Sequence, residues 1–228
     1  GIVSDLLELS RLEAGSSEAE REPIDVAGLL ALMRKEVLAR PDRPAQFDLH
    51  LESDALLLGA ETELHSIFQN LITNAVKYTP SAGTVSVRYW TDGLGGHVAV
   101  ADTGIGIPAA HIPRLTERFY RVDAGRSRKL GGSGLGLAIV KHALQRHGAQ
   151  LEITSEEGKG STFTCHFPPA RVQKRVGRGR LGRLAGARLG RGRIGSFGFI
   201  RRHARQSYFN LIIQSIAIRG HPAAGKPR

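Results

Sequence analysis

The stretch Gly131–His142 constrains the fold of this chain more than any other, because four glycines within six residues run directly into an apolar, helix-forming segment. Glycine lets the backbone adopt positive φ and approach a ligand closely. A helix N-terminus adds unpaired N–H groups and the positive end of the helix dipole, which favour an anion. The pattern predicts a loop-to-helix seat for a phosphate group. A glycine-rich turn before a helix is also common as a plain connection, so the rest of the chain has to supply the other parts of a nucleotide site.

The positive charge of the chain is concentrated in its C-terminal segment. Arg171–Arg228 holds 15 Lys and Arg residues and no Asp or Glu, while residues 1–170 hold 17 basic and 21 acidic residues. A segment rich in Arg and Gly with scattered aromatic residues suits binding to nucleic acid or anionic lipid. A shifted reading frame in a GC-rich gene gives the same composition, and we favour that interpretation for residues 170–228, with most of the segment disordered.

The remaining composition excludes two kinds of protein. A single cysteine leaves no internal disulfide framework and no cysteine-based zinc site. The longest apolar stretch, Tyr208–Ile218, is shorter than the ~20 residues of a membrane span and is interrupted by polar side chains. We therefore expect the chain to be soluble.

Hydrophobic periodicity divides the chain before Pro169 into a helix, a linker and one domain. An amphipathic helix is expected at the N-terminus, ending at Gly15, and it is typical of the end of a helical hairpin whose other part is missing. A polar linker is expected over residues 16–22 and the domain over residues 23–169. Within the domain, helices are expected over residues 26–39 and 61–77 and from the glycine-rich stretch to His147.

Strands are expected between and after these helices, over residues 47–51, 56–58, 84–91, 97–102, 150–154 and 161–167. Short glycine-containing turns join the third to the fourth and the fifth to the sixth of them as hairpins. The pattern predicts an α/β two-layer sandwich with a mixed, mostly antiparallel sheet packed on about three helices.

Asn70, Asn74 and Lys77 share one face of the helix expected over residues 61–77, because they are spaced four and three residues apart. Asparagine is a poor residue for a helix interior, so two of them in line need a reason. One interpretation is a solvated face with local hydrogen bonds. The other is a site for a divalent metal and phosphate, since amide oxygen is a hard ligand suited to Mg²⁺ and the lysine offsets phosphate charge. The helix alone leaves these two interpretations evenly balanced.

A turn and a basic loop supply candidates for the rest of a nucleotide site. Asp102–Pro108 directly follows a strand, and a carboxylate there can accept a hydrogen bond from an exocyclic amine such as that of adenine; an ordinary Asp-x-Gly turn is the alternative. Arg118–Asp123 combines an aromatic pair with cations, which can stack on a base and pair with phosphates. Three further basic residues follow: Arg126, Arg128 and Lys129. We interpret this loop as a lid that moves, against the alternative of a plain solvated loop.

Together these motifs resemble the N, G1, F and G2 boxes of bacterial sensor histidine kinases, in the order and at the spacing usual for that family. The matching stretches are Asn70–Tyr78, Asp102–Gly106, Arg118–Arg121 and Gly132–Leu137. Four ordered motifs are far more specific than one. The resemblance covers about residues 1–169 and implies the Bergerat-type ATP-binding fold shared with gyrase, the Hsp90 chaperones and the MutL repair proteins. Ser4–Gly15 resembles the end of the family's dimerisation hairpin.

The resemblance also implies a role for each part of the phosphate side of the site. Asn74 would ligate Mg²⁺, and Asn70 and Lys77 would contact phosphate as catalytic residues, with Tyr78 beside them. The G2 box would hold the phosphates through its backbone, at Gly132, Gly134, Leu135, Gly136 and Leu137.

On the base side, the resemblance implies that Asp102 binds the adenine amino group. The turn around the base would consist of Gly104, Ile105, Gly106 and Ile107. Tyr120 and Arg121 would line the lid side, and Thr162 would lie near the adenine.

Three features depart from the family pattern. The family's phosphoacceptor histidine stands in a His-Glu-x-x-x-Pro-like motif, and none of the nine histidines here has that context. We therefore expect the acceptor upstream of Gly1 and no self-phosphorylation of the family's kind by this chain. Ala60 follows Gly59 where Asp is common, which alters a local helix cap. Leu115 stands where Phe is common, which predicts looser packing of the lid.

The resulting prediction is the catalytic, ATP-binding part of a two-component protein histidine kinase that uses ATP and Mg²⁺. Hydrolytic relatives carry a Glu base four residues before the metal-binding Asn, but that position here is Asn70, whose amide is no base at neutral pH. Phosphoryl transfer to an imidazole depends on positioning and charge stabilisation instead. The alternatives are an ATPase of the gyrase and Hsp90 class, or a non-enzymatic, ATP-regulated interaction module whose basic tail contacts nucleic acid or lipid.

The family resemblance further implies the setting of the parent protein. Its partners would be the dimerisation and phosphoacceptor domain of the same kinase, within a homodimer, and a response regulator. The catalytic domain would lie in the cytoplasm, with the parent protein anchored in the inner membrane. Nucleic acid is an unlikely partner except through the tail.

Overall fold

The computed structural model describes residues 2–15, 21–122 and 132–175. They belong to one unit that runs from Gly1 to Gly177. Most of the linker expected over residues 16–22 lies outside the described residues, as do Arg126, Arg128, Lys129 and Gly131 and the tail from residue 176 onward.

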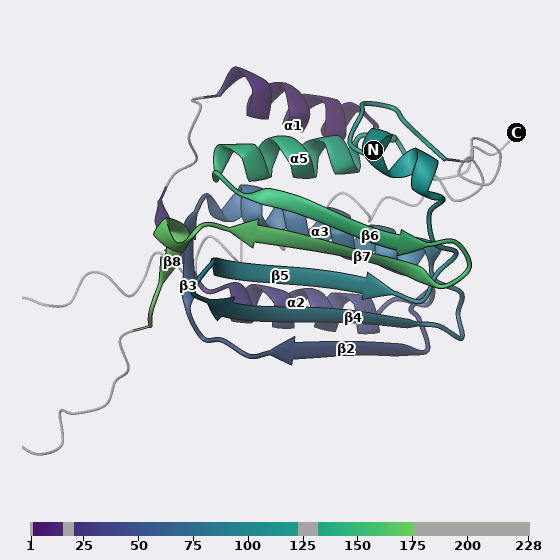
Figure 1. The fold of residues 1–228 in the computed structure, drawn as a ribbon, viewed down its shortest axis with the longest axis horizontal. Coiled ribbons are helices and arrows are strands. Elements are labelled where there is room, and N and C mark those ends of the chain that lie inside the picture. The colour runs from purple at the N-terminus through teal and green to yellow at the C-terminus, as the bar shows by residue number, and fades with distance from the viewer. Residues whose placement is uncertain (1, 16–20, 123–131, 176–228) are drawn as a thin grey trace, which may run out of the picture. The chain divides into compact units, whose positions relative to one another are not determined.

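A five-stranded sheet runs through the described part of the chain and confirms the predicted α/β sandwich (Figure 1). The strands are β2 (Gln46–Leu51), β4 (Thr84–Asp92), β5 (Gly95–Asp102), β6 (Gln150–Glu156) and β7 (Gly160–Phe167). Their order is β2-β4-β5-β7-β6, with β2 and β4 parallel and every other neighbouring pair antiparallel. The sheet is therefore mixed and mostly antiparallel, and the β4–β5 and β6–β7 hairpins are those that the turn residues predict.

Helices pack on one face of this sheet (Figure 1). They are α2 (Val26–Leu38), α3 (Glu61–Tyr78) and α5 (Gly136–Arg146). Their apolar stripes meet alternate strand residues, such as Val87, Val98 and Phe163, in one hydrophobic core. Asp25 begins α2 as its sequence context predicts, because its carboxylate accepts a hydrogen bond from the Gly28 N–H.

The N-terminal helix α1 (Ile2–Ala14) packs beside α5 (Figure 1). Leu9 and Leu12 are buried in the common core. Glu13 forms an ion pair with Arg118, and its carboxylate lies 3.5 Å from Nε2 of His142 on α5. The helix therefore contacts both α5 and the first residue of the loop that we interpret as a lid.

A second, three-stranded sheet was not predicted. It consists of β1 (Glu22–Ile24), β3 (Leu56–Gly59) and β8 (Val172–Gln173) in the order β1-β3-β8. Only β3 was expected, because strands of two or three residues are too short to show a period. The short 3-10 helices η1 (Ala109–Arg114) and η2 (Pro169–Arg171) were missed as well. The ordered body thus begins one residue before the expected domain boundary and continues past Pro169.

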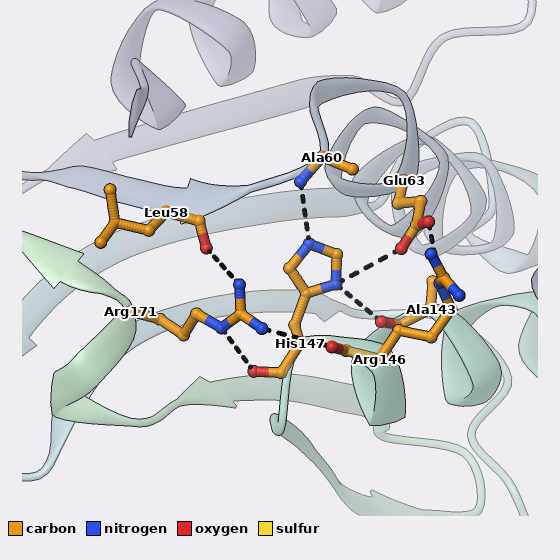
Figure 2. Close-up of polar contacts among 7 residues, drawn as sticks. All are labelled: Leu58, Ala60, Glu63, Ala143, Arg146, His147 and Arg171. Carbon is orange, nitrogen blue, oxygen red and sulfur yellow. Dashed lines mark hydrogen bonds and ion pairs between the residues drawn. The ribbon is translucent and has the colours of Figure 1, made fainter. Parts of the chain in front are cut away.

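A buried polar network joins α3 to the end of α5 (Figure 2). His147 is 1% exposed. Its Nδ1 donates to the Ala143 carbonyl at 2.7 Å, and its Nε2 accepts from the Ala60 N–H at 3.3 Å. Glu63 forms an ion pair with Arg146 at 2.9 Å, and its second oxygen lies 3.6 Å from His147 Nδ1. The imidazole is therefore neutral, with its proton on Nδ1.

This network makes the stability of the fold depend on pH. Burial lowers the pKa of His147 below its ordinary value of 6.5, although Glu63 opposes the shift. A second ring proton would point Nε2–H at the Ala60 N–H, so the unfolded chain binds more protons than the folded one below pH 6.5. We expect the free energy of unfolding to be constant above pH 6.5 and to fall as the pH is lowered from there toward the folded-state pKa. Urea unfolding at pH 7.5 and pH 5.5 measures this, and the pH dependence should be smaller in His147→Gln; an equal dependence in both proteins would contradict the assignment.

Candidate functional site

A cavity of about 440 Å³ lies where the second half of α3, the start of α5 and the turn after β5 meet. This volume is in the usual range for a small-molecule site. Most of the residues that the sequence predicts for a nucleotide site line it: Asn70, Asn74, Lys77, Tyr78, Asp102, Ile105, Gly106, Ile107, Tyr120, Arg121, Gly132, Gly134, Gly136 and Leu137. The fold therefore brings all four motifs to one place.

The amide face of α3 forms one wall. The Asn70 Nδ2 donates to the Ser66 carbonyl at 2.9 Å. Its Oδ1 faces the start of α5, where a Cβ on Gly136 would lie only 2.6 Å away. The Asn74 amide lines the cavity and has no hydrogen-bond partner among the described residues. Of the two amides, Asn70 is fixed by the helix and Asn74 is left for a ligand.

The glycine-rich stretch passes close to α3 and to the first residues of the loop that we interpret as a lid. A Cβ on Gly132 would lie 2.5 Å from Lys77 Nζ. Gly134 has φ +73°, and a Cβ there would lie 2.9 Å from the backbone of Phe119. The Phe119 N–H donates to the Gly134 carbonyl at 2.9 Å, and Phe119 itself has φ +61°, which is strained for a bulky residue. The two ends of the lid segment are thus held together by a contact that excludes any side chain at position 134.

Asp102 ends β5 and lines the cavity at a second wall. Its Oδ1 accepts a hydrogen bond from the Gly104 N–H at 2.8 Å. Burial raises the pKa of the Asp102 carboxyl above its usual range, and hydrogen bonds from the backbones of Gly104 and Ser161 partly offset this shift. A partly desolvated carboxylate is a strong acceptor for an amino group of a ligand.

The β6–β7 hairpin shapes the turn after β5. Gly106 has φ +65°, and a Cβ on it would collide with the carbonyl oxygen of Glu156. The Ile107 N–H donates to Ser155 Oγ at 2.8 Å, and that hydroxyl donates in turn to the Gly160 carbonyl at 2.9 Å. The turn that would face a base is therefore held against a hairpin far along the chain.

The first residues of the loop that we interpret as a lid, Arg118–Val122, place two side chains at the cavity. Tyr120 Oη shares a hydrogen bond with His111 Nδ1 at 2.6 Å, and the Arg114 guanidinium lies 4.3 Å above the Tyr120 ring. Arg121 Nη2 is buried without a hydrogen-bond partner among the described residues. A buried guanidinium nitrogen in that state suits an anionic ligand. Leu115, which departs from the family pattern, is buried at the cavity wall.

Three predicted contacts lie outside the cavity lining. Thr162 is not a lining residue, because Ser161 and Phe163 line the cavity and strand alternation places Thr162 on the opposite face of β7. Leu135 is fully buried in the core instead. Gly104 contributes its backbone N–H to the turn but does not line the cavity.

Several lining residues were missed by sequence reasoning: Asp5, Thr73, Ala75, Pro108, Leu115, Val122, Ser133, Glu157, Ser161 and Phe163. Strand alternation could have identified Ser161 and Phe163 as alternatives to their neighbour. Asp5 carries no signal in the sequence, because only the packing of α1 on α5 brings it to the cavity. Its Oδ2 accepts a hydrogen bond from Ser133 Oγ at 2.6 Å.

Asp5 places a negative charge beside the loop that would hold phosphates, so its removal should strengthen anion binding. We expect Asp5→Asn, which keeps a hydrogen-bond acceptor for Ser133, to bind ATP about fivefold more tightly, since like charges about 4 Å apart in a water-like medium repel by ~1 kcal/mol. Calorimetric titration with ATP measures the effect. Glu8→Gln removes the same charge one turn along α1, away from the cavity, and should leave the affinity unchanged. Equal affinities in Asp5→Asn and the parent chain would show that the carboxylate does not face the bound phosphates.

The sequence of the region that forms this cavity is similar to sequences of known proteins. Residues 59–171 match the family described as histidine kinase-, DNA gyrase B-, and HSP90-like ATPase. The chain is 52% identical over 172 residues to the phosphate regulon sensor protein PhoR of Pseudomonas aeruginosa, which covers 75% of this chain and 39% of that protein. It is 37% identical over 180 residues to the sensor histidine kinase WalK of Bacillus subtilis, which covers 73% of this chain and 28% of that protein. The chain thus spans well under half the length of these relatives.

Solved structures share the fold. Full-length ShkA in complex with AMPPNP superposes with a TM-score of 0.65 at 29% identity, over 76% of this chain and 36% of that chain. The mycobacterial sensor histidine kinase MprB superposes with a TM-score of 0.54 at 26% identity, over 65% of this chain and 97% of that chain.

Proposed function

Because the chain belongs to the histidine kinase-, DNA gyrase B- and HSP90-like ATPase family and carries the ATP-binding domain of a sensor histidine kinase, we propose that it binds ATP in this cavity and transfers the γ-phosphate to a histidine on a dimerisation domain. The observation that carries the proposal is the convergence of three features on one cavity: the amide face of α3, the carboxylate that ends β5 and the glycine loop before α5. An anion seat and an amine acceptor in one cavity match the two ends of ATP.

The donor set of the cavity fits Mg²⁺ held jointly by protein, phosphate and water. Asn74 offers an amide oxygen without a protein partner among the described residues. Mg²⁺ usually keeps several waters and takes one or two protein ligands beside substrate phosphates. The described residues contain no cluster of three or more His, Cys, Asp or Glu side chains suited to a metal. Asn74 would therefore hold the ion only together with ATP, and the bound ion would neutralise phosphate charge.

The residues of the cavity divide the work of binding and positioning. Asp102 accepts the amino group of the base, and the turn from Ile105 to Ile107 lies along the ring. Lys77 and the N-terminus of α5 offset the charge of the phosphates. Arg121 supplies a further cation from the first residues of the lid loop. All of these groups orient ATP or stabilise charge, which is what phosphoryl transfer requires of the protein.

Transfer to a histidine is favoured over hydrolysis because of Asn70. Its amide nitrogen is engaged by Ser66 and its oxygen faces the start of α5. Neither atom can take a proton from water at neutral pH, so the cavity has no base at the position where hydrolytic relatives place a glutamate. The imidazole of an acceptor histidine is itself a nucleophile and needs no such base.

The rest of the parent protein is proposed from its relatives. We infer a homodimer whose dimerisation domain carries the acceptor histidine, a response regulator as the second acceptor, and anchoring in the inner membrane with this domain in the cytoplasm. The similarity to a phosphate regulon sensor favours phosphate availability as the signal. None of the described helices has the length and hydropathy needed to cross a bilayer.

The proposal is tested with the chain and a separate acceptor. We expect the chain to bind ATP in the presence of Mg²⁺ and to form acid-labile phosphohistidine on the isolated dimerisation domain of the Pseudomonas relative. Asn74→Ala should lower both by about 100-fold or more, while Thr162→Ala, on the outer face of β7, should lower neither. Rapid multiple-turnover hydrolysis of ATP without an acceptor would identify an ATPase instead, and absence of ATP binding would overturn the assignment of the cavity.

A further inference from the structure

Two histidines on the sheet face away from the helices take no part in the function proposed above. His97 of β5 and His166 of β7 are directly opposite each other in the antiparallel register. Their neighbours Val98 and Cys165 are fully buried in the core, so alternation places both imidazoles on the other face. The His97 side chain is 4% exposed, whereas the His166 side chain is 34% exposed. His97 is therefore buried, whereas His166 is accessible to solvent.

The two imidazoles face each other through their Nδ1 atoms, which lie 2.8 Å apart. Each Nε2 is held by a carboxylate: His97 by Asp92 at 2.9 Å, and His166 by Glu152 at 3.0 Å. A carboxylate can only accept, so both Nε2 atoms carry hydrogen. The Nδ1 lone pairs then face one another, and at 2.8 Å a shared hydrogen lies between them.

This arrangement is the one that metal-binding histidines adopt. Such residues donate the N–H of the ring nitrogen that does not bind the metal to a carboxylate or carbonyl, which fixes the tautomer and raises the basicity of the nitrogen that does. Here two histidines do so, and both remaining nitrogens converge on one point. We propose that His97 and His166 bind one divalent transition-metal ion of the Zn²⁺ and Cu²⁺ class through their Nδ1 atoms. Asp92 and Glu152 orient the two rings without binding the metal.

The geometry needs only a small adjustment to accept an ion. Two imidazole nitrogens bound to one tetrahedral ion at about 2.05 Å lie about 3.3 Å apart, so the rings separate by roughly half an ångström as the metal replaces the shared hydrogen. Among the residues that the structure describes, no third His, Cys, Asp or Glu completes a cluster. Water fills the remaining positions, which the exposure of His166 allows.

The negative charge around the two histidines favours a divalent cation. Asp92 and Glu152 bring two negative charges to the pair. On the neighbouring strand β4, the Arg88 guanidinium lies 4.5 Å above the Trp90 ring. It is neutralised by two hydrogen bonds to the Glu52 carboxylate at 2.7 and 2.8 Å. Imidazole nitrogen suits Zn²⁺, Cu²⁺ and Ni²⁺, whereas Mg²⁺ prefers oxygen.

The site is separate from the nucleotide cavity. His97 and Asp102 are five residues apart on β5, which places them about 17 Å apart along the strand. None of the four residues lines the cavity. The inference therefore does not depend on the proposed kinase function, and ATP affinity serves as an independent measure of an intact fold.

Trp90 provides the probe, since it is the only tryptophan in the chain and its ring lies 5.0 Å from that of His97. Cu²⁺ bound between the histidines should quench Trp90 fluorescence at micromolar concentration. Zn²⁺, which has a filled d shell and does not quench, should restore the signal when it is added in large excess, because Cu²⁺ binds nitrogen ligands more tightly. The titration is done on the full chain without nucleotide or other metals.

Three variants decide the outcome. His166→Gln should need at least tenfold more Cu²⁺ for the same quenching, and Glu152→Gln should weaken binding about tenfold through loss of the orienting carboxylate. His50→Gln, at an exposed position on β2, should behave like the parent chain and corrects for other histidines. Both test variants should keep the ATP affinity of the parent chain. Equal quenching in the parent chain and His166→Gln would overturn the proposal.

Discussion

Gly106→Ala is expected to lose ATP binding while the sheet and helices stay folded. Gly106 has φ +65°, a conformation that costs an L-residue about 1–2 kcal/mol, and its added Cβ would collide with the Glu156 carbonyl. The turn must then leave the β6–β7 hairpin and take Ile105 and Ile107, both cavity-lining residues, with it. We expect the affinity for ATP to fall at least about 30-fold, which corresponds to ~2 kcal/mol. Calorimetric titration measures the affinity, and circular dichroism checks the fold.

Gly93→Ala is the matched control for this substitution. Gly93 lies in the turn between β4 and β5, and a Cβ there meets no atom within 4 Å. Its ATP affinity and its stability should equal those of the parent chain. Normal ATP affinity in Gly106→Ala would show that the turn after β5 does not contact the base. It would then also contradict the assignment of Asp102 as the acceptor for the amino group of the base.

The parts of the site that lie within one motif were predictable from the sequence. The face shared by Asn70, Asn74 and Lys77 follows from helical spacing alone, and α3 places all three at the cavity. A glycine with positive φ was expected in this stretch, where another part of the molecule comes close to the backbone. The structure shows that Gly134 has this conformation and that the backbone of Phe119 is what lies against it. Helical periodicity and the conformations that glycine allows depend on residues a few positions apart, so both can be predicted from the sequence alone.

What depends on packing between distant segments could not be predicted. Ser161 lines the cavity and the predicted Thr162 does not, because the register of β7 against β5 decides which side chains face it, and a shift of one residue reverses the face. Asp5 reaches the cavity only through the contact of α1 with α5. The hydrogen bond from Ile107 to Ser155 joins segments 48 residues apart. These contacts form when the core closes, and no pattern of nearby residues marks them.

Regular structure continues past the C-terminal boundary expected at Pro169, for a related reason. The two prolines at 168 and 169 and the abrupt change of composition predict an end of the domain there, but η2 and β8 continue the body through Gln173. Arg171 is 3% exposed within it. In the sequence, Arg171 cannot be distinguished from the other arginines of the basic tail, because only its contacts in the structure set it apart. We therefore propose that any change of reading frame falls after Gln173, which sequencing the parent gene across this region tests.

Those contacts make Arg171 the position with the largest expected effect on stability. Its guanidinium donates to the carbonyls of Leu58, Arg146 and His147, which belong to β3 and to the end of α5 (Figure 2). Arg171→Met keeps much of the side-chain volume but leaves these carbonyls without their donor. Each buried orphan group costs about 1–3 kcal/mol, and water entering the site recovers part of this. We expect the free energy of unfolding, measured in urea, to fall by about 3–5 kcal/mol.

Arg40→Met shows how this loss differs from that of an ordinary arginine. Arg40 makes two hydrogen bonds, both to Asp42, but the pair is exposed to solvent. Water replaces the lost partner there, so the substitution should cost less than about 1 kcal/mol. Similar losses in Arg40→Met and Arg171→Met would mean that Arg171 is hydrated and that the body does not depend on it. A large loss at Arg171 alone would show that the first residues after Pro169 are needed to hold β3 and α5 together, and hence that the catalytic domain ends beyond them.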